Sequence, residues 1–471
     1  MLLIQKWDDQ SPLPHYVQLY ETIKQEIASG QLAVGSRLPS IRKLADLLAI
    51  STTPVELAYQ QLIAEGFIES KPKRGYYVQQ LPEPYMRLGE EKPETNAANK
   101  DHLLWGERRY RYDFHLSKND FRSFPFRTWS RLLQQALHPD AKELLFYGDP
   151  QGELGLRQEI ARYLYHFRGV KCLPEQIVVG AEQHLLLSFL GQILKPYASG
   201  IGVENPGYPL VSSTFRQRGY DVVPIDLEED GLSVEELYKH DVQLAHVSPS
   251  HQYPRGMMLP IAKRLQLLEW TKKVNGFVIE DDYDGEFRYQ GRPIPSLQGL
   301  LPDSRVIYLG GFSQSLAPAL CINYMVLPAI LLDDFRRFYW ETLFEQSSSP
   351  IHQQTLRLFM QEGYWERHVR KMRNIYRKKH DRLVASIQTH FQERGQIIGK
   401  GAGFHLLLQV DSPKSEAVLL QEARDAGIRI ASSAYTWSPP IERKEFILGF
   451  GGIEIDDIEP GIARLHQVWF S

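Results

Sequence analysis

The chain has 471 residues, of which 43% are hydrophobic and 24% charged, and its formal net charge is −3. This composition is typical of a globular protein with two or three domains, and it excludes binding to nucleic acid through a global positive charge. The only two cysteines, Cys172 and Cys321, are too few for a disulfide scaffold or a cysteine metal site.

Neither a metal site nor a membrane segment is expected. The histidines show no metal-ligand spacing, and no uncharged apolar run approaches the roughly 20 residues that a membrane span needs. Asp8 and Asp9 precede any apolar core, so the opening segment lacks the pattern of a signal peptide. We therefore expect a cytoplasmic protein with no membrane contact.

Residues 1–80 have the pattern of a compact helical unit that ends in a hairpin. Apolar residues at helical spacing predict a first helix that ends near Gly30. Ser40 can cap a short second helix, and Ser51 or Thr52 can cap a third. Strand-like segments then flank the turn SKPKRG, which predicts a hairpin with a basic tip. The predicted apolar positions of the first and third helices are Tyr16, Leu19, Tyr20, Ile23, Ile27, Val55, Tyr59, Leu62 and Ile63.

This order of elements is typical of a winged helix-turn-helix, in which a helix with short polar side chains enters the major groove and basic groups contact phosphates. The segments GQLAVGSRLPSIRKLADLLAIS, VELAYQQLIAEGFI and RGYYV resemble the GntR-type winged helix, which implies binding to double-stranded promoter DNA. The residues expected to contact DNA are Arg37, Ser40, Arg42, Lys43, Ser51, Thr52, Thr53, Lys73, Arg74 and Gly75.

The winged helix departs from the family pattern in its charge. Thr52 stands where the family usually has an arginine, and Glu56 in the same helix would repel phosphate. Residues 1–80 hold eight Lys or Arg and eight Asp or Glu, so the unit is neutral. We expect modest DNA binding unless two copies act together. The alternative is a winged helix that is kept for protein contacts.

The rest of the chain predicts a linker and an α/β domain. Residues 81–110 are rich in Pro, Glu, Asn and Lys and have no sustained period, which favours an extended linker. From residue 111 to 471, short apolar strands alternate with helices, which predicts a mainly parallel sheet covered by helices. A smaller C-terminal α+β lobe is expected from about residue 350. The predicted strands of the sheet are 177–180, 201–204, 244–249, 276–282 and 305–310.

Five motifs in residues 111–471 resemble those of fold-type I, PLP-dependent aminotransferases, where PLP is pyridoxal 5′-phosphate. They are YGDPQG at 147–152, VGAEQ at 179–183, ENPGY at 204–208, PSHQYPRG at 249–256 and IEDDY at 279–283. Together with the GntR-type head they resemble the MocR-type subfamily of transcription regulators. That resemblance implies a homodimer, because the cofactor site of this fold is shared across the subunit interface.

The resemblance also implies roles for single residues. Tyr147 would reach the cofactor phosphate of the partner subunit, and the turn at 180–182 would cradle phosphate at a helix N-terminus. Asp281, or as second choice Asp282, would pair with the ring nitrogen, and Tyr283 would face the ring oxygen. The complete expected set is Tyr147, Gly180, Ala181, Glu182, Tyr208, His251, Asp281, Asp282, Tyr283, Ser313 and Gln314.

The loop GGFSQSLAP at 310–318 departs from that family. The family writes it approximately as G-T-F-S-K-S-L-x-P-G-L-R, in which the lysine forms a Schiff base with PLP and the arginine grips the phosphate. This chain has Gly311 for the threonine, Gln314 for the lysine and Cys321 for the arginine. Gly452 stands where the family has the arginine that binds a substrate carboxylate.

These replacements exclude transamination. An amide has no nucleophilic amine, so Gln314 cannot form an imine or shuttle a proton. Loss of the arginine removes about 1.5–3 kcal/mol of charge-assisted hydrogen bonding and loss of the threonine about 1 kcal/mol, so PLP could bind only non-covalently. The site then has three open interpretations, which are non-covalent PLP or its amine form, another small anionic or neutral ligand, and an empty dimerisation scaffold.

We therefore expect a DNA-binding transcription regulator with a catalytically degenerate, ligand-sensing domain, whose small-molecule effector the sequence does not identify. One alternative is a PLP-dependent enzyme that uses a relocated catalytic lysine. The other is a constitutive DNA-binding dimer that senses nothing.

Overall fold

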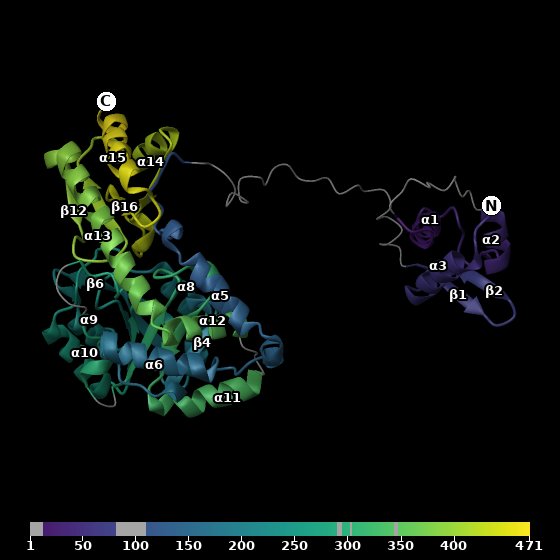
Figure 1. Ribbon diagram of the computed structural model, residues 1–471, viewed down its shortest axis with the longest axis horizontal. Coiled ribbons are helices and arrows are strands. Elements are labelled where there is room, and N and C mark those ends of the chain that lie inside the picture. The colour runs from purple at the N-terminus through teal and green to yellow at the C-terminus, as the bar shows by residue number, and fades with distance from the viewer. Residues whose placement is uncertain (1–12, 82–109, 290–293, 302–303, 343–346) are drawn as a thin grey trace. The chain divides into compact units, whose positions relative to one another are not determined.

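The computed structural model describes residues 13–81, 110–289, 294–301, 304–342 and 347–471. The chain divides into two compact units, Met1–Glu107 and Arg108–Ser471, and each is described here by itself (Figure 1). Of the linker expected at 81–110, only Leu81 and Tyr110 belong to the described residues.

The first unit is a winged helix (Figure 1). Helices α1 and α3 pack on each other, and α2 packs on α3. The Oγ of Ser40 accepts a hydrogen bond from the backbone N–H of Lys43 at 3.3 Å, which confirms the expected cap of α2. The elements are α1 (His15–Ala28), α2 (Ile41–Leu48), α3 (Thr52–Ala64), β1 (Ile68–Lys71) and β2 (Gly75–Val78).

Tyr16 and Ile63, which the helical spacing predicts to be buried, are exposed in the structure. Ile63 is 37% exposed, because Val55, Ala58, Tyr59 and Leu62 already complete the buried stripe of α3. Tyr16 is likewise exposed, at the first turn of α1, where the buried face only begins at Leu19. The side chain of Ser51, the N-cap residue of α3, makes no capping hydrogen bond. The remaining predicted apolar positions are buried as expected.

The second unit is built on an eight-stranded sheet with the order β4-β11-β10-β9-β8-β5-β6-β7. The sheet is mixed, because β11 runs antiparallel to both β4 and β10, and β7 runs antiparallel to β6. Every residue of β4, β5, β8 and β9 is buried, as expected for strands covered on both faces. The strands are β4 (Ile177–Gly180), β5 (Gly200–Asn205), β6 (Asp221–Glu228), β7 (Gly231–Leu232), β8 (Leu244–Val247), β9 (Phe277–Asp281), β10 (Val306–Gly311) and β11 (Asn323–Val326).

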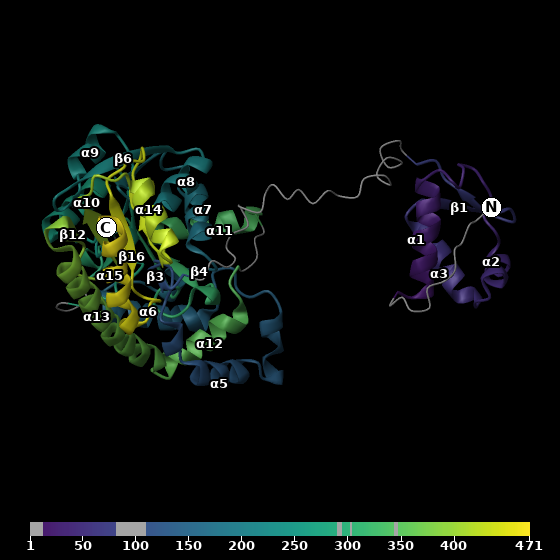
Figure 2. The same cartoon turned by 90° about the horizontal axis from the view of Figure 1, so that it is seen from above.

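Helices cover this sheet (Figure 2). Helices α6 and α7 pack on β4, and α10 packs on β9. Helix α12 packs on α5 and α6. The helices of this part are α5 (Phe126–Ala136), α6 (Leu154–Arg168), α7 (Gln183–Ile193), α8 (Pro209–Gln217), α9 (Val234–Lys239), α10 (Ile261–Lys273), α11 (Leu332–Thr342) and α12 (Pro350–Gln361).

A smaller α+β lobe completes the second unit, as predicted. Its four-stranded sheet has the order β12-β13-β16-β15. The short β3 (Tyr112–Asp113) pairs with β14 of the lobe. The remaining elements are α13 (Tyr364–Phe391), β12 (Gly395–Ile398), β13 (His405–Val410), α14 (Glu416–Asp425), β14 (Ile428–Arg429), β15 (Ala431–Ser432), β16 (Glu445–Gly449) and α15 (Ile455–Phe470).

In the part of the chain that the structure describes, no helix is long and apolar enough to cross a membrane. The same ranges contain no group of three His, Cys, Asp or Glu residues that could hold a metal ion.

Candidate functional site

The residues predicted to contact DNA lie on the surface of the first unit. All are exposed except Gly75, which is half-buried. Within residues 13–81 the five predicted basic residues form no ion pair, whereas Lys71 lies 2.7 Å from Glu69. Their charges are therefore available to phosphates. The five are Arg37, Arg42, Lys43, Lys73 and Arg74.

Arg37 lies beside the hairpin. Its backbone bridges that of Tyr77, and a Cβ on Gly75 would lie 3.1 Å from the Nε of Arg37. Gly75 also has a φ of +108°, which favours glycine. The structure thus brings Arg37 next to the hairpin tip that carries Lys73 and Arg74.

The exposed face of α3 includes residues that the sequence reasoning missed. Thr53, Glu56, Leu57 and Gln60 are all exposed and follow the spacing i, i+3, i+4 and i+7, so they share one face of the helix. The spacing opposite the apolar stripe was the signal that could have identified Leu57 and Gln60. A polar amide, a carboxylate and a leucine on this face are groups that can contact base edges in the major groove.

A second site lies where β4, β9 and β10 end and β11 begins. Asn323, the first residue of β11, pairs with Gly180 on one side and with Gly311 on the other. Asp281 is the last residue of β9, next to β10. Open α/β sheets bind ligands at the carboxyl ends of their strands. We call this set the strand-end site; it comprises Gly180, Ala181, Glu182, Gln183, Asp281, Gly311, Phe312, Ser313, Gln314 and Asn323.

Asp281 is a buried carboxylate held from one side. Its Oδ2 accepts a hydrogen bond from the Nε2 of Gln183 at 2.8 Å and lies 3.6 Å from the Nε2 of His246. Its Oδ1 has no hydrogen-bond partner among the described residues. Gln183 and His246 were not predicted as site residues, because their approach to Asp281 depends on the order of the strands.

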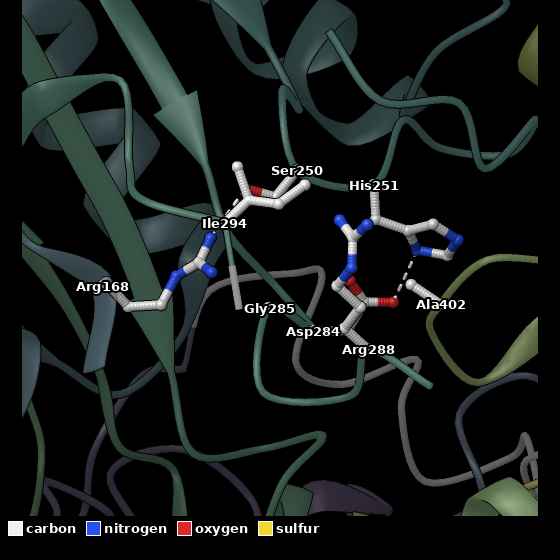
Figure 3. Close-up of a pocket in the computed structure, with 8 residues that line it drawn as sticks. All are labelled: Arg168, Ser250, His251, Asp284, Gly285, Arg288, Ile294 and Ala402. Atoms are coloured by element: carbon white, nitrogen blue, oxygen red, sulfur yellow. Dashed lines mark hydrogen bonds and ion pairs between the residues drawn. The ribbon is translucent and has the colours of Figure 1, made fainter. Parts of the chain in front are cut away.

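Asp282 is engaged elsewhere. Its Oδ2 accepts a hydrogen bond from the Nε of Arg168 at 2.6 Å and another from the hydroxyl of Tyr308. Arg168 also donates to the Oγ of Ser250 at 2.6 Å, beside a small cavity (Figure 3). This buried ion pair leaves Asp281 as the better candidate to face a ligand.

The loop at 249–256 brings His251 to Tyr283. The Nδ1 of His251 lies 2.8 Å from Oδ2 of Asp284 (Figure 3) and 3.0 Å from the hydroxyl of Tyr283. Burial raises the pKa of Asp284, and the neighbouring His251 opposes that rise. Burial also raises the pKa of Tyr283. The hydroxyl of Tyr283 is therefore a neutral group whose position His251 fixes.

The two other predicted tyrosines are more exposed. Tyr208 is 39% exposed, and its ring contacts that of Tyr253. Tyr147 is 62% exposed. Its ring contacts Phe146, and it makes no polar contact with the strand-end site in the described ranges.

Two side chains of the chain itself form hydrogen bonds with Ala181 in the expected phosphate cradle. The Nδ2 of Asn323 donates to the carbonyl oxygen of Ala181 at 2.8 Å, and the N–H of Ala181 donates to the Oγ of Ser347 at 3.1 Å. A Cβ on Gly311 would lie 2.1 Å from the Oδ1 of Asn323. A threonine at position 311, as in the aminotransferase family, would therefore require the side-chain amide of Asn323 to move. Glu182 is exposed at the N-cap of α7, without a capping hydrogen bond from its side chain.

Gln314, Cys321 and Gly452 occupy the three positions to which the family resemblance assigns anchoring side chains. The Oε1 of Gln314 is buried and has no hydrogen-bond partner among the described residues. Cys321 is exposed, with a φ of +53°. A Cβ on Gly452 would lie 2.4 Å from the Cβ of Lys118, so an arginine at 452 would require the segment that contains Lys118 to move. The residues present thus match the ring side of a PLP site, through Asp281 and Tyr283, but not its phosphate side.

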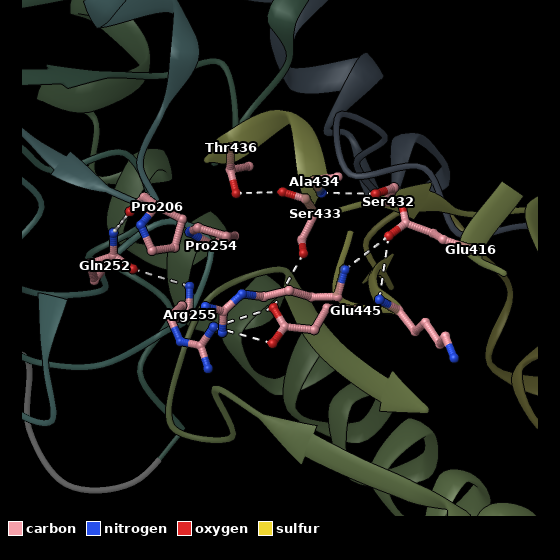
Figure 4. A network of polar contacts seen from close by, with 12 residues as sticks. Pro206, Gln252, Pro254, Arg255, Glu416, Ser432, Ser433, Ala434, Thr436 and Glu445 are labelled. Atoms are coloured by element: carbon pink, nitrogen blue, oxygen red, sulfur yellow. Dashed lines mark hydrogen bonds and ion pairs between the residues drawn. The ribbon is translucent and has the colours of Figure 1, made fainter. Parts of the chain in front are cut away.

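A polar network joins the loop at 249–256 to the C-terminal lobe (Figure 4). The Nη1 of Arg255 lies 3.3 Å from Oε2 of the buried Glu445. Ser433 donates to the same carboxylate at 3.3 Å, and the Oε1 of Gln252 accepts from the N–H of Arg255 at 3.2 Å. The loop that positions Tyr283 through His251 is therefore tied to β16.

Comparisons with known proteins agree with both halves of this description. Residues 15–78 match the family of bacterial regulatory proteins of the gntR type, and residues 113–435 match aminotransferase class I and II. The kynurenine aminotransferase of Pyrococcus horikoshii superposes with a TM-score of 0.69 at 21% identity, covering 86% of this chain and 97% of that one. At this identity the likeness shows the fold.

Known transcription regulators match this chain along nearly their whole length. The uncharacterized HTH-type transcriptional regulator YhdI of Bacillus subtilis is 40% identical, over 98% of this chain and 97% of the relative. The probable rhizopine catabolism regulatory protein MocR of Rhizobium meliloti is 32% identical, over 98% and 95%. The HTH-type pyridoxine biosynthesis transcriptional regulator PdxR of Corynebacterium glutamicum is 30% identical, over 96% and 95%.

Proposed function

Because the chain belongs to the MocR-type transcription regulators of the GntR family, we propose that its winged helix binds promoter DNA and that its aminotransferase-like domain senses a small molecule without catalysis. The proposal that the large domain senses without catalysis rests on Gln314, which by resemblance stands where the aminotransferase family has its Schiff-base lysine. We assign residues 1–80 to the DNA-binding domain, 81–110 to a linker and 111–471 to the effector and dimerisation domain.

The DNA-binding half is supported by the unpaired basic groups of the head. Arg37, Lys73 and Arg74 would contact phosphates from the hairpin side, and Arg42 and Lys43 from α2. The short polar side chains at the start of α3 would enter the major groove. These would be Ser51, Thr52 and Thr53, with Ser40 and Gly75 supplying backbone contacts near phosphates.

The sensing half is supported by the polar groups at the strand ends. Asp281 would face the most basic atom of the ligand, and Tyr283, fixed by His251, would face a ligand oxygen or nitrogen. The other residues expected to line the ligand are Gly180, Ala181, Glu182, Tyr208, Asp282, Ser313 and Gln314. Differential binding of the ligand to two arrangements of the dimer would then change how the heads are held.

A relocated catalytic lysine is disfavoured by the contacts of two nearby lysines. Lys118, beside Gly452, forms an ion pair with Asp113. The buried Nζ of Lys379 donates to the carbonyl oxygen of Gly451 at 2.8 Å and lies 3.1 Å from Asp120. Borohydride reduction after incubation with PLP, followed by peptide mass mapping, tests this directly. A pyridoxyl-modified lysine would support the enzyme.

A homodimer is supported by exposed apolar side chains before α6. Leu145 is 76% exposed and Phe146 is 73% exposed, next to the exposed Tyr147. Adjoining apolar groups of this size on a surface mark an interaction site. Two heads in one dimer would read two half-sites, which compensates for the neutral charge of each head. Sedimentation equilibrium of the full chain is expected to give a dimer.

The decisive experiment is a selection of bound fragments from a random double-stranded DNA library by the full-length protein at low salt. We expect an enriched sequence with two related half-sites, because two equal heads bind it. If no sequence is enriched over non-specific DNA, the regulator proposal is wrong. If a sequence is enriched but its affinity is the same across a panel of metabolites, the protein is a constitutive DNA-binding dimer.

A further inference from the structure

We infer that the strand-end site binds a small molecule that carries a protonated amine and no phosphate, and that it rejects phosphate monoesters. This inference rests on the proposed sensing function of the large domain and names the chemical class of its ligand. Three features of the described residues support it. Two side chains form hydrogen bonds with Ala181 in the expected phosphate cradle, the site lacks positive charge, and, in the part of the chain that the structure describes, two of its hydrogen-bond acceptors have no donor.

The hydrogen bonds at Ala181 oppose the binding of a phosphate group. A phosphate at a helix N-terminus needs free backbone N–H groups. The N–H of Ala181 already donates to Ser347, and the side chain of Asn323 donates to the carbonyl oxygen of Ala181 and holds its Oδ1 2.1 Å from where a Cβ on Gly311 would lie. A phosphate group would have to displace both side chains and leave that carbonyl without its donor.

The charge of the site acts in the same direction. Glu182 places a carboxylate at the N-terminus of α7, where a bound anion would otherwise be stabilised. Gln314, Cys321 and Gly452 are uncharged at the three positions where the aminotransferase family has cationic side chains. The carboxylate of Asp281 remains. Relative to the family, position 314 of the strand-end site and positions 321 and 452 outside it lack three positive charges, while the carboxylate of Asp281 remains, so the site attracts cations.

The acceptors without donors indicate what the ligand must supply. The Oδ1 of Asp281 and the buried Oε1 of Gln314 have no hydrogen-bond partner within the described ranges. A buried acceptor without a donor is costly, so a ligand that donates to it gains affinity. An ammonium group has three donors and a positive charge. In the aminotransferase family the amine belongs to the protein, and here it would belong to the ligand.

A matched pair of probes tests this inference. Pyridoxamine and pyridoxamine 5′-phosphate share the ring and the aminomethyl group, and they differ in the phosphate alone. Isothermal titration calorimetry of the full chain is expected to show pyridoxamine binding at least about tenfold more tightly, a difference of about 1.4 kcal/mol. Equal affinity, tighter binding of the phosphorylated probe, or no binding of either probe would overturn the inference.

Two variants locate the binding. Asp281→Asn is expected to weaken pyridoxamine binding at least about tenfold, since it removes the charge that pairs with the amine. Asp333→Asn, on the exposed start of α11, is the matched control and should change nothing. Glu182→Gln is expected to strengthen binding of the phosphorylated probe. If Asp281→Asn, folded by circular dichroism, binds pyridoxamine like the wild type, the inference is wrong.

The same preparations separate this inference from the proposed function. Each is also titrated with the DNA fragment selected by the wild type, and binding is followed by fluorescence anisotropy. A protein that retains its DNA but prefers the phosphorylated probe contradicts the inference and leaves the regulator intact. A protein that selects no DNA contradicts the proposed function, whatever its ligand.

Discussion

An amide at position 314 cannot form a Schiff base, and the contacts of Asn323 and Ser347 lead us to expect that a lysine there would not by itself allow PLP to bind. Both side chains form hydrogen bonds with Ala181 in the cradle that would hold the phosphate, independently of residue 314. A Schiff base needs the aldehyde held close to the lysine for long enough to react. Position 314 and the cradle therefore have to change together.

The first prediction concerns that dependence. A Gln314→Lys variant is expected to show no imine absorbance band on titration with PLP, because the phosphate is still excluded. The variant that combines Gln314→Lys with Cys321→Arg, Asn323→Gly and Ser347→Gly should show the band, with wild type as the blank. An imine in the single variant would contradict this prediction, because it would show that the PLP phosphate can displace Asn323 and Ser347.

The second prediction concerns pH. Burial raises the pKa of Glu204 to about 8, against the opposing hydrogen bonds from the N–H of Ser248 and from Gln252. The folded state therefore holds a proton that the unfolded state releases above its ordinary pKa of 4.5. The stabilisation is complete below pH 4.5 and is lost as the pH rises toward 8. Each pKa unit corresponds to about 1.4 kcal/mol.

Glu204→Gln removes this titration. The free energy of unfolding of the large domain should fall less between pH 5 and pH 8 in the variant than in the wild type, by up to a few kcal/mol. Urea denaturation followed by tryptophan fluorescence at both pH values gives the two differences. Parallel losses in the two proteins would show that Glu204 ionises freely when folded.

The sequence was sufficient to propose Gln314 and Cys321 as replaced anchors, because both positions lie in or next to one recognisable loop. It could not find what fills the site. Ser347 and Ala181 are 166 residues apart, and they meet only because the chain returns to the end of β4. The choice between Asp281 and Asp282 was likewise undecidable from the motif, since Arg168, the partner that engages Asp282, lies 114 residues away.

At the scale of single elements, we propose that α3 contacts bases and that the hairpin contacts phosphates. Glu56, Leu57 and Gln60 are exposed on one face of α3, whereas Lys73 and Arg74 lie at the hairpin tip. Contacts with base edges determine which sequence is preferred, whereas contacts with phosphates determine affinity for every sequence. Substitutions in α3 should therefore change base preference, and substitutions in the hairpin should change the salt dependence of binding.

Lys73→Ala and Arg74→Ala are expected to weaken binding to every sequence alike. Each should lower the slope of log affinity against log salt by about 1, because one phosphate contact is lost. Lys71→Ala is the matched control in the same hairpin, with a smaller expected effect, since Lys71 is paired with Glu69. Titrations at four salt concentrations measure the slopes. An unchanged slope in both hairpin variants would remove the hairpin from the DNA contact.

Glu56→Gln is expected to change which base is preferred. A carboxylate accepts from the amino group of cytosine, whereas an amide pairs with adenine, and such contacts discriminate by about 1–3 kcal/mol. Loss of the negative charge should also raise the affinity for DNA in general. Parallel library selections with wild type and variant compare the enriched bases. Identical enrichment would show that Glu56 does not face a base.

Elements were easier to predict than their pairing. Short apolar runs identified β4, β5, β8, β9 and β10, because strands buried on both faces are continuously apolar. The same run of residues is compatible with a parallel or an antiparallel neighbour. The pattern therefore could not predict that the antiparallel β11 lies inside the sheet, between the edge strand β4 and β10, nor that Asn323 lies between the ends of those two strands.

At the scale of the whole molecule, the two units of the chain differ in what stabilises them. The winged helix has one small core around residues such as Ile23, Val55 and Leu62. The large unit has several buried clusters, which include those of the main sheet and of the C-terminal lobe. We expect calorimetry of the full chain to show a separate, smaller transition for the head. A single transition for the entire chain would mean that the units stabilise each other.

Helix α13 sets how the large unit itself can unfold. Over its 28 residues it contributes Trp365 and Val369 to the cluster of the main sheet, and Tyr376, Leu383 and Phe391 to the cluster of the lobe. If α13 unfolds, both clusters lose buried side chains. We therefore expect the lobe to unfold together with the main sheet, without a melting transition of its own. Cleavage of α13 by a protease is therefore expected to unfold the main sheet and the C-terminal lobe together. Partly folded fragments of the large unit should then not accumulate in the cell.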